Sequence, residues 1–198
     1  MARPRMFDEE SALNAAMRTF WEKGYEATST QDLCDATGLA RSSIYNTFKS
    51  KQDLFERALA RYIEAMTTAQ LAVLEDRSLS AADRIRALFA MVVDGETEHR
   101  THGRGRGCLT VNATVELAGR DPRAAELLER DTARRLSALR AVIEEGGRDG
   151  SITSTRDAGA LARFLNATIG GMRISSQGGA DRAVLESVAE IAMDALGG

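Results

Sequence analysis

Residues 39–51 have side chains of the types and spacing that bind nucleic acid. Arg41 is followed directly by two serines and the segment contains no acid, although the 198-residue chain has a net charge of −3. Arginine can donate two parallel hydrogen bonds to guanine, and a serine hydroxyl can donate or accept. Lys49 and Lys51 follow at positions suited to phosphate oxygens. The segment is predicted to contact DNA; a merely solvated basic face is the alternative.

The elements that would position these side chains are short helices with marked ends. Residues 29–32 form a Ser-x-x-Asp capping box, which predicts a helix that begins there and ends at Gly38. A second short helix is expected over residues 41–48, before another capping box at Ser50 begins a long helix. With a first helix over residues 8–23, this is the helix-turn-helix pattern, whose second helix enters the major groove. The agreement of caps, turn and charge favours DNA binding over a solvated face.

A 40-residue segment that includes these helices resembles a known family. The segment FWEKGYEATSTQDLCDATGLARSSIYNTFKSKQDLFERAL is similar to the DNA-binding domain of the TetR family of transcriptional regulators. The resemblance implies an all-α homodimer that binds an inverted-repeat operator in double-stranded DNA and responds to a small-molecule effector. It further implies phosphate contacts from Thr28 and Ser29, base contacts from Arg41, Ser42 and Ser43, and DNA-facing side chains at Tyr45, Lys49 and Lys51.

Two positions depart from the family pattern. Ala40 replaces the hydroxyl residue that is common at the start of the recognition helix, and the lost cap is worth about 1 kcal/mol. Thr47 stands where a second aromatic residue is frequent, so the resemblance assigns no contact to it.

The rest of the chain shows helical spacing and no alternating strand-like runs. The fold class is therefore predicted to be all-α, with an N-terminal three-helix helix-turn-helix domain (residues 1–50) and a larger helical effector-binding and dimerisation domain (residues 51–198). A helix over residues 51–69 would link the two and make DNA binding and effector binding mutually exclusive. Further helices are expected over residues 81–98, 108–118, 123–145, 155–177 and 181–196.

Effector sites in the family lie among the helices of the C-terminal body, where apolar walls and a few polar groups would hold a ligand. Ordinary core packing is the alternative for every apolar candidate. The candidates are Phe89, Val92, Cys108, Val111, Asn112, Val115, Glu116, Phe164, Asn166 and Ile169.

The last two expected helices carry apolar stripes suited to a dimer, because in this family they pack against their symmetry mates as a four-helix bundle. The Gly170-Gly171 pair would permit close approach of two backbones. The alternative is that both stripes face the protein's own core. The predicted interface residues are Leu161, Leu165, Ile169, Met172, Val184, Val188 and Ile191.

The two cysteines raise a second hypothesis for sensing. Cys108 would begin a helix, just after Arg104 and Arg106, and positive charge lowers a thiol pKa. Some family members sense oxidants or electrophiles through cysteine, so Cys108 could be a redox sensor; packing near a pocket wall is the plainer interpretation. Cys34 is expected to be packed in the helix-turn-helix domain.

Other chemistry finds little support. His99 and His102 could in principle hold a metal, but a solvated pair in a Gly-Arg linker is the preferred interpretation, and neither a metal nor a cofactor is expected. No catalytic constellation is recognisable, which leaves a small all-α enzyme as an unsupported alternative. With 43% hydrophobic residues, no secretory signal and no apolar run near the roughly 20 residues of a membrane span, a soluble cytoplasmic protein is expected.

Overall fold

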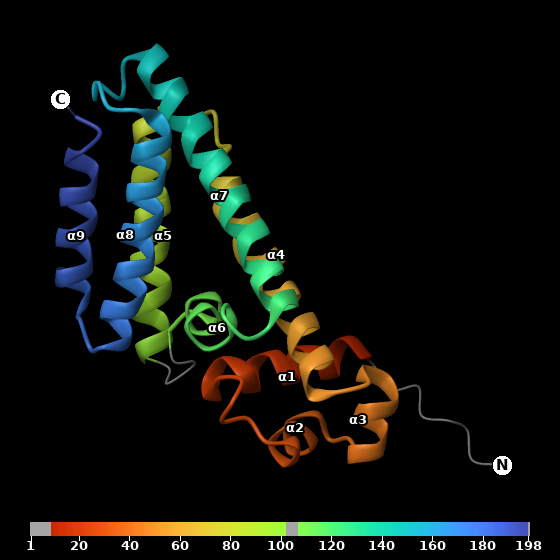
Figure 1. Ribbon diagram of the computed structural model, residues 1–198. Helices are drawn as coiled ribbons and strands as arrows, with labels where there is room; N and C mark the ends of the chain where they lie inside the picture. The colour runs from red at the N-terminus through yellow and green to blue at the C-terminus, as the bar shows by residue number, and fades with distance from the viewer. Residues whose placement is uncertain (1–8, 102–106, 198) are drawn as a thin grey trace.

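The computed structural model describes residues 9–101 and 107–197, and within them nine α-helices and no strand occur, which confirms the all-α prediction. Figure 1 shows α1, α2 and α3 gathered at one end, α4 running from them beside α7, α5 and α8 close to α9, and α6 in the middle. None of the described helices has the length and apolarity to cross a membrane. The helices are α1 (Glu9–Lys23), α2 (Thr30–Thr37), α3 (Arg41–Phe48), α4 (Lys51–Leu74), α5 (Ala81–Thr101), α6 (Leu109–Leu117), α7 (Pro122–Asp149), α8 (Ala158–Gln177) and α9 (Arg182–Asp194).

The caps expected around the helix-turn-helix are confirmed. The Ser29 hydroxyl accepts from the Asp32 N–H, and the Asp32 carboxylate accepts from the Ser29 N–H at 2.8 Å, which completes the capping box of α2. Gly38 ends this helix in the left-handed conformation at φ 69°, where glycine is unstrained. The Ser50 hydroxyl caps α4 by accepting from the Asp53 N–H, whereas Ala40 gives α3 no side-chain cap, as expected. These local bonds set the angle at which α3 leaves the turn.

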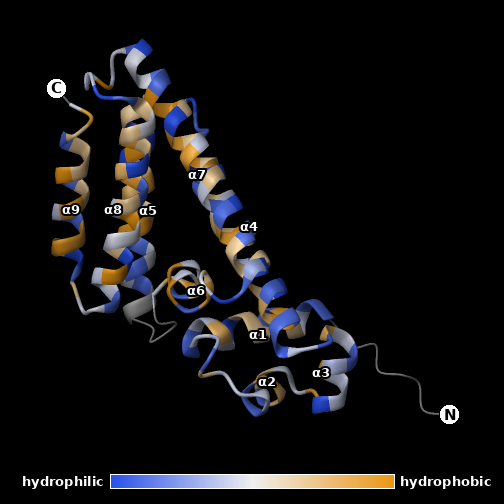
Figure 2. Ribbon diagram, viewed as in Figure 1, coloured by the Kyte–Doolittle hydropathy of each residue, from blue (hydrophilic) through white to orange (hydrophobic). Residues whose placement is uncertain are grey.

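Two apolar clusters form the interior, visible in Figure 2 as the orange inner faces of the helices. The first joins α1–α3 to the first half of α4, and it continues into α6 and the start of α7. Phe20 and Phe55 pack edge to face within it, at a centroid distance of 5.1 Å. The second cluster fills the space among α5, α7, α8 and α9. Since residues 54–63 of α4 lie in the first cluster, the domain boundary at residue 50 stays a prediction.

Helix α7 is longer than its sequence pattern predicted. The prediction ended it at Glu145, before a glycine pair, but the helix continues through both glycines to Asp149. A Cβ on Gly146 would lie 2.5 Å from Ile152, so this glycine serves a close packing contact rather than a break. Gly150, at φ 80°, ends the helix instead. The N-terminus of α7 is as predicted, with Asp121 as cap and Pro122 in the first turn.

Candidate nucleic-acid interface and effector pocket

Helix α3 presents a polar face to solvent at the end of the molecule farthest from α9 (Figure 1). Arg41, Ser42 and Lys49 are exposed, and Ser43 is half-buried. The Arg41 guanidinium lies 5.7 Å from the centre of the Tyr45 ring, in cation–π contact, while the buried Ile44 and Phe48 anchor the opposite face. Anchored in this way, α3 holds its basic N-terminus outward.

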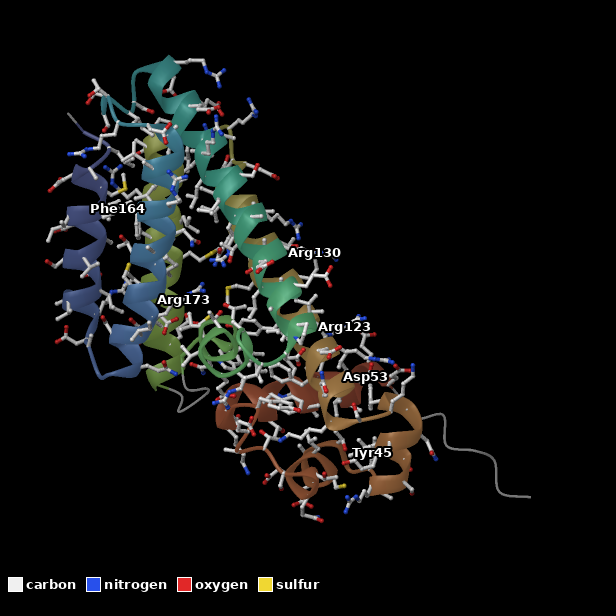
Figure 3. All side chains as sticks on the ribbon, viewed as in Figure 1. Tyr45, Asp53, Arg123, Arg130, Phe164 and Arg173 are labelled. Carbon is white, nitrogen blue, oxygen red and sulfur yellow. The ribbon has the colours of Figure 1, made fainter. Side chains whose placement is uncertain are left out.

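Tyr45 connects the two helices of the motif. Its hydroxyl lies 2.9 Å from the Thr30 hydroxyl at the start of α2, and the ring is half-buried between the helices (Figure 3). This contact fixes the α2–α3 angle and holds the ring on which Arg41 stacks. Tyr45 therefore lies at the surface predicted to face DNA, with its hydroxyl already hydrogen-bonded to α2.

Asn46 is a residue of this face that the sequence reasoning missed. It is exposed, and it lies four residues after Ser42, which places both on one side of α3. An asparagine amide can bond adenine with two hydrogen bonds, so its chemistry suits base contact. The helical spacing from Ser42 was the signal that could have found it.

Thr28 requires a correction, because it is only 1% exposed and its hydroxyl donates to the Gly24 carbonyl at 2.6 Å. A side chain buried in the turn after α1 cannot reach a phosphate, so Thr28 supports the fold instead. Ser29 is exposed, and its hydroxyl is already engaged with Asp32 in the capping box. Only its position at the N-terminus of α2, where helix N–H groups favour anions, still suits a phosphate contact.

The charges around the motif favour a negatively charged partner. Lys49 closes α3 at φ 55° and is exposed, whereas the Lys51 ammonium lies 4.5 Å from the centre of the Tyr25 ring. The hydrogen bond from the Lys23 ammonium, together with Ser29, holds the pKa of the Asp32 carboxyl well below its usual range. The Lys23 charge therefore offsets the one acid at the start of α2.

A cavity of about 290 Å³ lies among α6, α7 and α8; we call it the α6–α7–α8 cavity. Of the predicted effector residues, Val111, Val115 and Asn166 line it. A larger groove of about 430 Å³ between α5 and α9 contains only Phe89 from the prediction. The described residues lining the α6–α7–α8 cavity are Thr110, Val111, Thr114, Val115, Leu128, Thr132, Arg135, Asn166, Ala167, Gly170, Arg173 and Ile174.

The other predicted effector residues lie elsewhere. Val92 and Ile169 are buried in the second apolar cluster, along with Phe89, so the alternative of ordinary core packing holds for them. Phe164, on α8, is 44% exposed and lines none of these spaces (Figure 3). Asn112 accepts from the Gln177 amide at 3.0 Å, which joins α6 to α8.

Glu116 joins α6 to the DNA-binding end of the molecule. Its carboxylate accepts from the Tyr25 N–H at 2.8 Å, just beyond the end of α1. Gly24 has φ 81°, which strains any other residue, and a Cβ there would lie 2.4 Å from this carboxylate, so a substitution would displace the Glu116 side chain. The Trp21 indole N–H donates to the Gly107 carbonyl immediately before α6. Both ends of α6 are thus hydrogen-bonded to the end of α1.

Cys108 is 2% exposed and occupies the N-cap position of α6 without a side-chain capping hydrogen bond. Its sulfur lies 3.0 Å from an Arg173 Nη1 and 3.6 Å from the Tyr62 hydroxyl. Burial raises the pKa of the thiol, but the Arg173 charge and the surrounding hydrogen bonds outweigh it, so the pKa is lower than usual. The cation beside Cys108 is therefore Arg173, while Arg104 and Arg106 lie outside the described residues.

The remaining cysteine and the histidines add little. Cys34 is half-buried against the first apolar cluster, in agreement with the packing role expected for it. The described residues contain no cluster of metal-ligating side chains, but His102 and the side chain of His99 lie outside what the structure describes. That pair stays an untested alternative.

The apolar stripe predicted on α8 for the dimer requires a correction. Leu161, Leu165, Ile169 and Met172 are all buried in the protomer's own second cluster, where a partner cannot contact them. The opposite side of α8 exposes Phe164 and Ile174. A Cβ on Gly170 or Gly171 would meet no atom of the described residues within 4 Å.

On α9 the predicted interface is partly accessible. Val184 is 48% exposed and Ile191 is 66% exposed, while Val188 between them is half-buried. These side chains share one face of the helix, three to four residues apart. The free apolar faces of α8 and α9 are thus a candidate interface that differs from the predicted one on α8.

The fold and this surface define a class of protein: a DNA-binding regulator with a helix-turn-helix on a helical body. Residues 12–58 match the family model described as bacterial regulatory proteins, tetR family, and residues 81–192 match the tetracyclin repressor-like C-terminal domain. The chain belongs to the TetR family and is a transcriptional regulator.

Similar proteins agree in fold and length. The HTH-type transcriptional repressor ComR of Escherichia coli is 34% identical over 96% of this chain and 88% of its own. The uncharacterized HTH-type transcriptional regulator YezE of Bacillus subtilis is 35% identical over 84% of each chain. A cysteine mutant of the TetR family regulator CifR, complexed with 26-base-pair operator DNA, has a TM-score of 0.85 and 29% identity over 98% of this chain and 100% of CifR.

Proposed function

We propose that the protein is a homodimeric repressor that binds an inverted-repeat operator and leaves it when a small molecule binds the helical body. The observation that carries the proposal is the exposed, acid-free face of α3 with Arg41 at its N-terminus. The names of its relatives support repression, since ComR is a repressor, and the CifR mutant is complexed with operator DNA.

In this proposal α3 enters the major groove. Arg41, Ser42 and Asn46 face base edges, and Ser43 lies beside them at the groove wall. Lys49, Lys51 and the N-terminus of α2 at Ser29 bind phosphates on either side, which positions the helix without reading sequence. Tyr45 holds Arg41 in place through the stacked contact.

The dimer forms through the free faces of α8 and α9. Pairing these faces would bury Phe164, Ile174, Val184 and Ile191, and the glycine pair would let two copies of α8 approach closely. A two-fold dimer carries two copies of α3, so its operator must be an inverted repeat.

Effector binding in the α6–α7–α8 cavity would reach the DNA-binding end through α6. Thr110, Val111, Thr114 and Val115 line the cavity, and Glu116 of the same helix bonds the end of α1. A ligand that displaces α6 therefore moves α1 directly, in addition to any shift of α4. Cys108 is too deeply buried to favour a thiol sensor, so the proposed effector binds noncovalently.

In this proposal the protein has no catalytic activity. It is located in the cytoplasm, where a bacterial repressor binds its operator. The test is a footprint of the purified protein on DNA from beside its own gene. A protected inverted repeat is expected, and the protected fragment should compete at least a hundredfold better than a scrambled one. Equal binding to both DNA fragments would refute the assignment.

A further inference from the structure

The charged side chains that line the α6–α7–α8 cavity are all positive. Its two charged side chains are Arg135 from α7 and Arg173 from α8, and no Asp or Glu occurs among the described residues that line it. Threonine hydroxyls and the Asn166 amide supply the other polar groups. A cavity lined by two guanidinium groups and no carboxylate favours an anion, because a hydrogen bond between a guanidinium N–H and a carboxylate is assisted by charge.

Two nitrogens of the Arg135 guanidinium are hydrogen-bonded within the protein, and the third, Nε, has no acceptor among the described residues. Its Nη2 pairs with Asp131 at 3.0 Å and its Nη1 donates to the Asn166 carbonyl oxygen at 2.9 Å. The Nε is buried and has no hydrogen-bond partner among the described residues. A buried guanidinium N–H without an acceptor is costly, and an acceptor in the cavity would remove that cost.

The carboxylates that balance the two arginines lie outside the lining. Asp131 is buried and also accepts from the Thr67 hydroxyl of α4. Glu96 of α5 lies 3.9 Å from the Arg173 Nε, beyond hydrogen-bond distance, and burial raises the pKa of its carboxyl. Arg173 also donates to Cys108, and Figure 3 shows it on the half of α8 that lies next to α6. The Glu96 carboxylate is thus too far from Arg173 for a hydrogen bond, which leaves room for a ligand anion beside this arginine.

The rest of the lining is apolar. Val111 and Val115 come from α6, Leu128 from α7, and Ala167 and Ile174 from α8. Gly170 leaves open space, since a Cβ there would meet no described atom within 4 Å. At about 290 Å³ the cavity is at the small end of the range for ligand pockets, roughly 300–1,000 Å³. It therefore suits a compact apolar group attached to a charged one.

We infer that the effector is a small organic carboxylate, with its anionic group between Arg135 and Arg173 and its apolar body against Val111, Val115 and Leu128. This inference rests on the proposed function for its biological meaning, since it names the ligand class of the proposed effector cavity. Binding itself does not depend on DNA.

The test uses benzoate and its uncharged counterpart benzamide as probes, with the full-length dimer in an isothermal titration without DNA. Benzoate should bind, and benzamide should bind at least tenfold more weakly. Arg135→Gln should weaken benzoate by about tenfold to a hundredfold, the usual effect of losing a charged hydrogen bond. The control is Arg130→Gln on the exposed side of α7, which should bind benzoate like the wild type.

A second variant guards against misfolding, since Arg135→Gln leaves Asp131 without its cation. Val111→Phe, on α6 and away from the proposed dimer interface, fills the cavity without changing a charge, and it should abolish benzoate binding in a protein that stays dimeric by ultracentrifugation. Equal affinity for benzoate and benzamide, no binding of benzoate, or unchanged binding by Val111→Phe each overturns the inference. If the wild type binds benzoate but no operator, the proposed function fails and the ligand assignment stands.

Discussion

Arg41 and Lys49 are predicted to act on DNA in different ways, and two substitutions separate them. Arg41→Ala removes a base contact worth about 1–3 kcal/mol. Because a dimer carries two copies, the loss on a symmetric operator is about 2–6 kcal/mol, or at least roughly thirtyfold in Kd. Arg41 is exposed and packs only on the Tyr45 ring, so the fold should lose no more than about 0.5 kcal/mol.

Lys49→Gln should instead weaken operator and scrambled DNA by the same factor. Each phosphate contact contributes about 0.9 to the slope of log K against log salt, so two lost contacts make the slope shallower by about 2. Glutamine suits this test because glutamine and lysine, which both have a Cβ, are equally strained at φ 55°. The loss of the positive charge is therefore the main change.

Fluorescence anisotropy on labelled operator and scrambled duplexes, from 50 to 300 mM salt, measures both effects. The wild type and the Arg130→Gln variant, which lies far from α3, serve as references. If Arg41→Ala lowers affinity equally for both duplexes, Arg41 contacts phosphate and the base-contact assignment fails. If Lys49→Gln leaves the salt slope unchanged, Lys49 does not contact the backbone.

Burial and hydrogen bonds lead to four further predictions. Leu165→Ala should lower the free energy of unfolding by about 2–5 kcal/mol in denaturant titrations, since its side chain is fully buried. Ile174→Glu, on the exposed face of the same helix, should instead give monomers in ultracentrifugation; a dimer would exclude this face. Glu116→Ala removes the bond to the Tyr25 N–H and should reduce the effect of effector on operator affinity, measured as the ratio of Kd with and without benzoate; an unchanged ratio would exclude α6 as the connection. Cys108→Ser should still release operator when effector binds, and a loss of release in gel shifts would restore the thiol hypothesis.

Much of the DNA-binding end could be predicted because its signals are local. The capping box at Ser29 and Asp32 spans four residues, and Gly38 ends α2 through its own backbone freedom. Ile44 and Phe48 are one turn apart, so their common burial follows from helical spacing alone. The same logic failed at Gly146, where a glycine pair predicted a break but a packing contact with Ile152 continued the helix.

The fold class, the helix-turn-helix and the exposed side of α3 could be inferred from the amino-acid sequence, because each depends on contacts within a turn or two of one helix. The partner that each apolar stripe meets became clear only from the packing of the helices, since helical spacing shows that a face is buried but not against what. The tertiary structure placed Leu165 in the core and Thr28 in the turn. It also brought Cys108 to Arg173, 65 residues away, and aligned Arg135 with Arg173 at one cavity. Those contacts depend on how α6, α7 and α8 pack against one another, and a local sequence pattern does not specify the packing of distant helices.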